Sequence, residues 1–223
     1  MTRLRAFAGV IATIGILGLP SPSQAAPITY TVTSIASGTL GGNAFTKAAV
    51  TVTLVGDTDG VFQPLPEDLP ALFVNPGTAT LMIAGLPTAT FNDPGGYAVV
   101  IFPAIPGEIP LPAVGIWEDV DIAAEHGIGI LGIGSDSVAG YNLQSAIGPL
   151  SGSAHGGATE PGGAFVNYST NLGAFVITST GDNGAFTVTT TPAQVPEPAS
   201  LSLLGVGGLS LLAARRRRKK QRS

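Results

Sequence analysis

The chain has 223 residues, ten of them basic and fourteen acidic, for a formal net charge of −4, and it contains no cysteine. The lack of cysteine excludes disulfides, thiolate metal sites and covalent thiol catalysis, so the fold must rest on packing and hydrogen bonds. Nine of the basic residues lie near the two ends, so residues 26–194 hold one lysine against thirteen acids, a net charge of −12 that disfavours nucleic acid and anionic lipid and favours divalent cations.

The first 25 residues have the pattern of a secretory signal peptide. Two arginines precede an apolar stretch at residues 6–19, and small residues follow up to Ala25. We expect signal peptidase to cut after Ala25 rather than after Ala26, because the second cut would leave Pro27 directly behind it. No twin-arginine pair is present, so we predict export by the Sec route.

Residues 26–191 are predicted to form one acidic, β-rich ectodomain. Threonine, valine and isoleucine alternate in its first part, which is typical of strands with one buried face. Strands are predicted at residues 28–36, 45–55, 78–84, 88–91, 97–102 and 114–120. Proline-rich loops are predicted at 62–76 and 103–112. Residues 121–131 could begin as a short helix, 138–147 could be a strand or a helical turn, and 148–163 resembles a glycine-rich loop.

An internal repeat follows. The sequence Gly-Ala-Phe begins similar eight-residue segments at residues 163, 173 and 184. Segments of this length with short connections predict three antiparallel strands linked by hairpins. Phe165, Phe175 and Phe186 would then share one face. We therefore predict an all-β fold, an antiparallel β-sandwich of the jelly-roll kind with nine to eleven strands, whose edges are blunted by proline and acid.

The C-terminal 30 residues differ from everything before them. Residues 192–198 form a short linker, and residues 199–214 are sixteen uncharged, mostly apolar residues. As a helix this run spans about 24 Å, somewhat less than the hydrocarbon core of a bilayer, and thinning or snorkelling could accommodate it. We predict a single transmembrane helix, because a buried amphipathic helix would show a polar stripe. The basic tail, residues 215–223, should stay in the cytoplasm. Its orienting residues are Arg215, Arg216, Arg217, Arg218, Lys219 and Lys220.

This segment resembles the sorting signal of the PEP-CTERM proteins of Gram-negative bacteria. The resemblance rests on the order of three parts: Val195, Pro196, Glu197 and Pro198 with the small residues after them, then the Leu/Gly run, then the arginines. It covers about thirty residues. It implies recognition of the proline–acid–proline element by a membrane protease of the exosortase type. It further implies cleavage near that element, loss of the tail, and delivery of the ectodomain to the outer surface or the exopolysaccharide matrix.

Acidic residues provide two weak candidates for a calcium site. Asp57 and Asp59 belong to an Asp-Thr-Asp-Gly segment like part of a calcium loop, but a hairpin turn explains the same residues. Asp119 and Asp121 would share one face of a strand, beside Glu118 and Glu125, and could chelate a hard cation or form a solvated edge. No metal or other cofactor is otherwise predicted.

The remaining chemistry-bearing residues show no catalytic pattern. His126 and His155 lie in glycine-rich surroundings without a metal-binding spacing, and exposed loop positions explain them. Three serines, at 135, 151 and 153, lack a Gly-x-Ser-x-Gly motif. Trp117 could stack on sugars with Tyr97 and Tyr141, although a single tryptophan in a β-protein usually belongs to the core.

The leading hypothesis is a non-enzymatic, exported protein, first held in the inner membrane with a periplasmic ectodomain and then sorted to the surface or matrix. There it would act in exopolysaccharide, biofilm or adhesion. Its predicted partners are signal peptidase, an exosortase-type protease and exopolysaccharide, with no nucleic acid. The alternative is a carbohydrate- or calcium-binding module. A polymer hydrolase that uses the acids around Glu118 is the third reading, and it requires a suitably spaced carboxylate pair.

Overall fold

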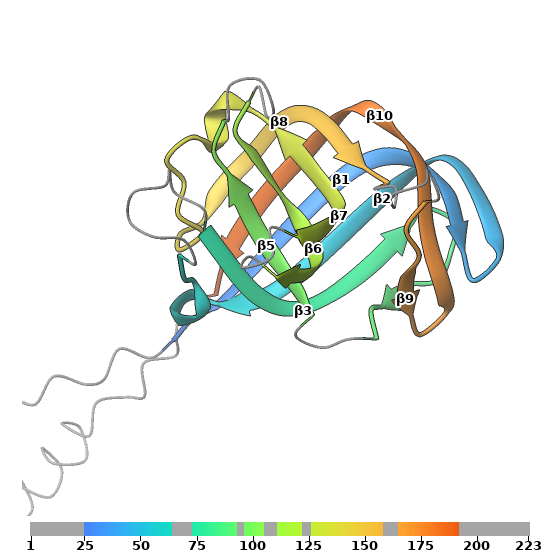
Figure 1. The fold of residues 1–223 in the computed structure, drawn as a ribbon, viewed down its shortest axis with the longest axis horizontal. Coiled ribbons are helices and arrows are strands. Elements are labelled where there is room, and N and C mark those ends of the chain that lie inside the picture. Colours follow the sequence, from blue (N-terminus) through green and yellow to red (C-terminus); the bar gives the residue numbers. More distant parts are fainter. Residues whose placement is uncertain are drawn as a thin grey trace, which may run out of the picture. The chain divides into compact units, whose positions relative to one another are not determined.

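Ten strands and two short 3-10 helices make up the described part of the chain, shown in Figure 1. This computed structural model describes residues 25–63, 73–92, 96–104, 111–121, 126–157 and 165–191, without the side chains of 119–121 and 126–128. The strands are β1 (Pro27–Leu40), β2 (Asn43–Asp57), β3 (Phe73–Ile83), β4 (Ala89–Thr90), β5 (Tyr97–Phe102), β6 (Ala113–Asp121), β7 (His126–Gly134), β8 (Ile147–Gly156), β9 (Tyr168–Thr170) and β10 (Gly173–Thr190). The 3-10 helices are η1 (Thr58–Gly60) and η3 (Asp136–Val138).

Eight of these strands close into an antiparallel barrel. The order is β1-β2-β3-β5-β6-β7-β8-β10, and β10 pairs with β1 to complete the ring. The two remaining strands are accessory, because β4 pairs with β3 and β9 pairs with β10. Figure 1 shows the ring, with β1 and β2 lying behind β5 and β6.

The predicted β-sandwich is therefore wrong, although the prediction of an all-β, antiparallel fold is confirmed. A sandwich has two sheets with open edges, whereas here the first and last long strands pair with each other over the length of β1. This pairing joins residues more than 130 positions apart, and the local alternation of residue types does not reveal it. Closure also removes the edges that proline and acid were expected to protect.

The core fills the inside of the barrel. Side chains at even positions from Ile28 to Leu40 point inward on β1 and are buried, while the odd positions face outward. Strand β2 alternates in the same way from Val50 to Leu54. Residues 25–192 form one compact unit. Within the described residues no helix is long and apolar enough to cross a membrane; the predicted span at 199–214 lies outside them.

Strand β10 contains two of the three predicted repeat strands in a single element. Phe175 and Phe186 are eleven residues apart, an odd spacing that would place them on opposite faces of a regular strand. In the pairing of β1 with β10, however, Ser34 lies opposite Gly184 and Gly38 lies opposite Ile177, so β10 advances seven residues where β1 advances four. The three extra residues are β-bulges, which turn both phenylalanines inward, where each is completely buried. Phe165, from the first repeat, lies outside the core and is 39% exposed.

Strand β8 lies where a glycine-rich loop was predicted. Two of its glycines lie close to neighbouring backbone: a Cβ on Gly152 would lie 2.3 Å from the oxygen of Gly134, and a Cβ on Gly156 would lie 2.7 Å from the oxygen of Ile130. Small residues are therefore needed for β8 to fit between β7 and β10, and pairing on both sides overrides its weak strand propensity. Residues 126–134, where the expected helical pattern fails, form strand β7.

Candidate functional site

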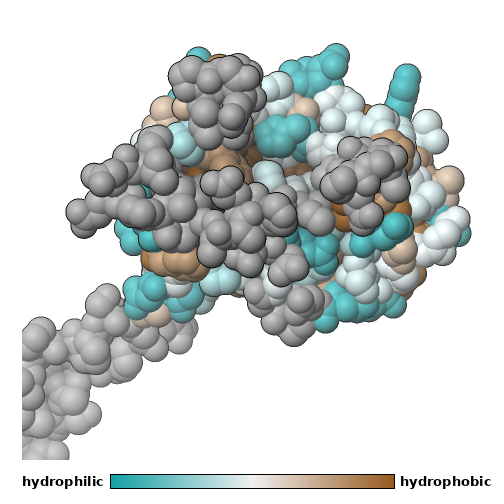
Figure 2. Space-filling model, viewed as in Figure 1, coloured by the Kyte–Doolittle hydropathy of each residue, from teal (hydrophilic) through white to brown (hydrophobic). Residues whose placement is uncertain are grey.

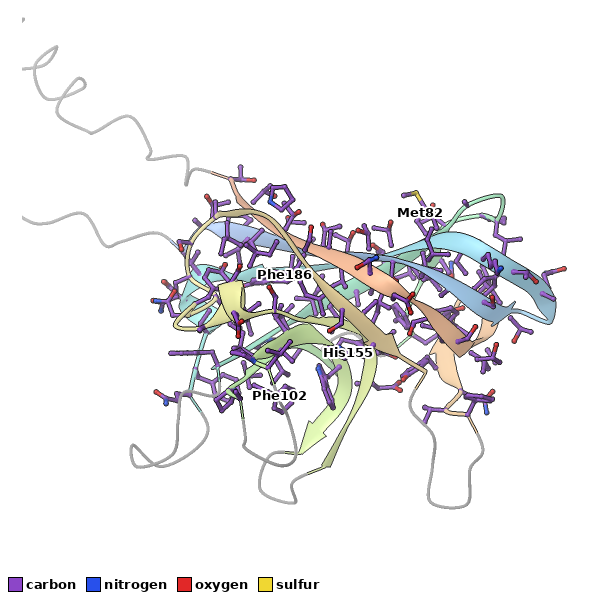
Figure 3. All side chains as sticks on the ribbon, turned by 90° about the horizontal axis from the view of Figure 1, so that it is seen from above. Met82, Phe102, His155 and Phe186 are labelled. Atoms are coloured by element: carbon purple, nitrogen blue, oxygen red, sulfur yellow. The ribbon has the colours of Figure 1, made fainter. Side chains whose placement is uncertain are left out.

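A small apolar cluster lies on the outside of the barrel, over β3, β5 and β6. Val74, Ala98 and Val100 point away from the barrel interior, yet each is at most 5% exposed. Phe102 and Trp117 pack against them, with ring centroids 4.7 Å apart. Figure 3 shows Phe102 and His155 on one side of the barrel, Met82 on the opposite side, and Phe186 between them. The single tryptophan is thus partly buried on the outer face of the barrel.

Glycines form the floor beside Trp117. A Cβ on Gly129 would lie 3.3 Å from the indole ring, and a Cβ on Gly132 would lie 2.5 Å from Nε2 of His155. The indole and the imidazole therefore pack close to backbone at glycine positions, which carry no side chain. His155 is an exposed residue on β8, but its contact with the sheet desolvates the ring and lowers its pKa below the ordinary value. Figure 2, which shows this side, has brown apolar patches next to pale and teal ones where the residues are described.

One end of the barrel interior holds a carboxylate among tyrosines. Glu118 accepts a 2.7 Å hydrogen bond from the hydroxyl of Tyr97. Tyr168 donates to the backbone oxygen of Gly129 at 2.8 Å, and burial, followed by the negative charge of Glu118, raises its pKa. The first bond joins β5 to β6, and the second joins β9 to β7. The carboxylate of Glu118 therefore has a hydrogen-bond partner inside the fold, which gives it a structural role.

The other notable polar group is Asn75, on β3. Its side chain is fully buried, and its amide nitrogen donates to the hydroxyl of Tyr30 at 2.6 Å and to the backbone oxygen of Asp57 at 3.0 Å. The Tyr30 hydroxyl in turn donates to the oxygen of Leu143 at 2.6 Å. Burial raises the pKa of Tyr30 to about 12, and the bond from Asn75 partly offsets this increase. Among the described residues, the carbonyl oxygen of Asn75 has no hydrogen-bond partner.

The outer surface of β10, β1, β2, β3 and β4 carries rows of hydroxyl groups. One row runs directly across all five strands, and the sheet register places its members side by side: Thr187, Thr31, Thr53, Thr80 and Thr90. The row on one side holds Thr189, Thr29, Val55 and Thr78, and the row on the other holds Ala185, Thr33, Thr51 and Met82. We call these three rows the threonine face. They carry no charged residue, although the ectodomain as a whole is strongly acidic.

The structure describes only some of the residues that were candidates for chemistry. Asp119, Asp121 and His126 are described by their backbone only, and the backbones of Asp121 and His126 pair in the β6–β7 ladder. Ser153 donates to the backbone oxygen of Gly134, and Ser135 caps η3. Within the described residues no group of three or more histidine and acidic side chains could hold a metal.

The suggested sugar platform of Trp117 with Tyr97 and Tyr141 does not form. Both tyrosines are buried inside the barrel, whereas Trp117 is on the outside. Alternation along β5 and β6 could have shown this, because Tyr97 and Trp117 lie diagonally across the ladder: Tyr97 pairs with Glu118 and Ala98 with Trp117.

Sequence reasoning missed two features: the unpartnered oxygen of Asn75 and the threonine face. The threonines that alternate in the predicted strands at 28–36 and 45–55 make up half of the threonines of the threonine face. The rows themselves depend on the pairing of β1 with β10, which no local pattern shows. Asn75 lay at the edge of a predicted proline-rich loop, so nothing marked it as buried.

These features define a β-barrel domain, and a C-terminal segment with the order of a sorting signal follows it in the sequence. Residues 194–218 match the family described as "PEP-CTERM protein-sorting motif". The chain is a PEP-CTERM protein. This sorting motif indicates that the chain is exported, that its sorting depends on exosortase, and that exosortase, a membrane protease, processes it. The matched residues lie outside the part of the chain that the structure describes. No curated protein and no solved structure matches the chain.

Proposed function

We propose that the barrel is a non-enzymatic component of the cell surface or extracellular matrix, which the C-terminal signal delivers and whose threonine face contacts exopolysaccharide. The observation that carries the proposal is the sorting motif at residues 194–218. In this account signal peptidase removes residues 1–25, residues 199–214 hold the chain in the inner membrane, and cleavage near Pro196–Pro198 releases a periplasmic ectodomain to the outside.

The threonine face supports the choice of partner. Neighbouring strands lie about 4.8 Å apart, so the row from Thr187 to Thr90 offers a regular series of hydroxyls, each able to donate and to accept. Because the face is uncharged, it can contact a polysaccharide, even an anionic one, without the repulsion that the acidic residues of the domain would cause. Threonine is also a strong strand former, so the same residues stabilise the sheet.

Delivery is tested by deleting residues 196–198 from the full chain in the producing cells. We expect the variant to accumulate in the inner membrane with its tail attached, while the parent chain reaches the surface or the medium. A matched control deletes three residues from the tail after Lys220. Release of the 196–198 variant at the parent's rate would contradict the sorting role.

Contact with polysaccharide is tested separately. The variant Thr31→Val, Thr53→Val and Thr80→Val removes three hydroxyls but keeps the branched shape that the sheet favours. We expect it to co-sediment several-fold less with exopolysaccharide isolated from the producing cells. The control, Ser151→Ala with Ser153→Ala, removes outward hydroxyls from β8 and should bind like the parent. Equal binding by both variants would reject the threonine face as the contact surface.

A further inference from the structure

The unpartnered oxygen of Asn75 lies beside a turn with two carboxylates. Asn75 is completely buried, and its Oδ1 atom is the one buried side-chain oxygen or nitrogen without a hydrogen-bond partner among the described residues. Leaving such a group unsatisfied costs roughly 1–3 kcal/mol, so native proteins usually provide it with a partner. We therefore expect this oxygen to have a partner that the described side chains do not supply.

The orientation of the amide is fixed by its neighbours. Both partners of its nitrogen must accept: the Tyr30 hydroxyl has already donated its proton to Leu143, and the second partner is the backbone oxygen of Asp57. Turning the amide over would place an oxygen against each acceptor. Oδ1 therefore faces the η1 turn and cannot exchange places with the nitrogen.

Two glycines lie close to this oxygen at the turn. A Cβ on Gly56 or on Gly60 would lie 3.0 Å from Oδ1, a tight contact, so glycine at both positions keeps side-chain carbon away from the oxygen. The Gly60 position is also 3.9 Å from Cβ of Asp57. A small ligand that contacts the Asn75 oxygen from the turn would lie near the Asp57 side chain, with Asp59 on the same turn.

The charge at the turn indicates which ligand fits. Asp57 and Asp59 are both exposed acids, and Lys47, the one basic side chain in the described ranges, lies near the opposite end of β2. Carboxylate and amide oxygens are the ligands that Ca²⁺ prefers, and water completes its six to eight contacts in flexible sites. Mg²⁺ demands stricter octahedral geometry and gives up its water reluctantly.

We propose that the η1 turn is a calcium site, in which Oδ1 of Asn75 and the carboxylates of Asp57 and Asp59 bind the cation. Thr58 exchanges hydrogen bonds with Ala26 through its backbone nitrogen, at 3.0 Å, and its hydroxyl, at 3.1 Å. Calcium therefore stabilises the start of β1, immediately after the predicted signal-peptide cut. The inference goes beyond sorting and does not depend on it.

The experiment follows thermal unfolding of the processed protein, purified from the producing cells and treated with a chelator. Titration with CaCl₂ should raise the Tm by several degrees, in proportion to the logarithm of concentration beyond the Kd, while MgCl₂ at matched ionic strength should have a much smaller effect. Terbium, a calcium mimic, should show luminescence sensitised by Tyr30, and calcium should quench it by competition.

Three variants locate the site. Asp59→Asn removes one ligand charge from an exposed position, and Gly60→Ala places a methyl group 3.0 Å from Oδ1. Each should raise the calcium concentration needed for half the Tm shift at least tenfold. Asp136→Asn, in the other 3-10 turn, is the matched control and should respond like the parent. A parent protein that does not respond to calcium would overturn the site and leave water as the partner of Asn75. A normal response of Asp59→Asn would also overturn it, by placing the cation elsewhere.

Discussion

Replacing Phe175 by alanine tests how the C-terminal repeat completes the barrel. The side chain is completely buried, and its ring packs against those of Phe45, Phe91 and Tyr168 at centroid distances of 6.3, 6.3 and 6.0 Å. These rings belong to other parts of the sheet, so they cannot collapse together into the space left behind. We therefore expect Phe175→Ala to reduce the free energy of unfolding by about 3–5 kcal/mol.

The repeat itself provides the control. Phe165 occupies the same position in the first repeat unit but is 39% exposed, so Phe165→Ala should change the free energy of unfolding by less than about 0.5 kcal/mol. Urea unfolding, followed by the fluorescence of Trp117, measures both values. In a thermal melt the buried substitution should lower the Tm by roughly 6–20 °C, at about 2–4 °C for each kcal/mol. Similar losses for the two variants would refute the bulged register that turns Phe175 inward.

Three further predictions follow from burial and close contacts. Burial favours the neutral form of Tyr30 and raises its pKa to about 12. The stabilisation that comes from keeping this hydroxyl neutral is complete below pH 10 and should be lost between pH 10 and 12, so alkaline unfolding and the rise in tyrosinate absorbance should coincide. Burial lowers the pKa of His155, so NMR titration should give a pKa below about 6.5, with the variant His126→Gln used to assign the signals. The stabilisation that the neutral His155 ring provides should be present at neutral pH and should be lost as the pH falls through this lowered pKa. A raised pKa would contradict the contact of His155 with Gly132. A Cβ on Gly38 would lie 1.9 Å from the backbone oxygen of Val176, so Gly38→Ala should cost about 1–3 kcal/mol, whereas Gly148→Ala, with nothing within 4 Å, should be nearly neutral; equal urea midpoints would contradict the β1–β10 register.

The local part of the fold could be predicted from the sequence. The alternation at 28–36 and 45–55 located β1 and β2, and the apolar run at 97–102 coincides with β5. Each of these strands has one face or both faces in contact with apolar neighbours, so residue type records burial directly.

The parts that depend on distant contacts could not be predicted. Strand β8 is held by β7 and β10 and needs glycine at Gly152 for close approach, so its composition resembles that of a loop. Likewise, bulges in β10 reverse the side-chain parity between Phe175 and Phe186. Barrel closure itself is set by pairing between the first and last strands, for which the chain carries no local signal.

The two kinds of candidate site differ in the same way. The sorting signal is linear, so reading residues 195–198 and the segments after them was sufficient to recognise it, and the family match agrees. The calcium proposal combines Asp57 and Asp59, which the sequence marked, with Asn75, which only the pairing of β2 and β3 brings to the turn. The weak local pattern became a specific, testable proposal once a third oxygen, that of Asn75, was located beside it.

The most direct test of the sorting role is the C-terminus of the protein that leaves the cell. Mass spectrometry of the released or surface-bound chain should find the barrel intact and should find no peptide from residues 199–223, because cleavage near Pro196–Pro198 removes the apolar run and the arginines. The same tail should be recovered on the chain from cells that lack exosortase activity. Full-length chains that carry residues 199–223 outside the cell would contradict the account.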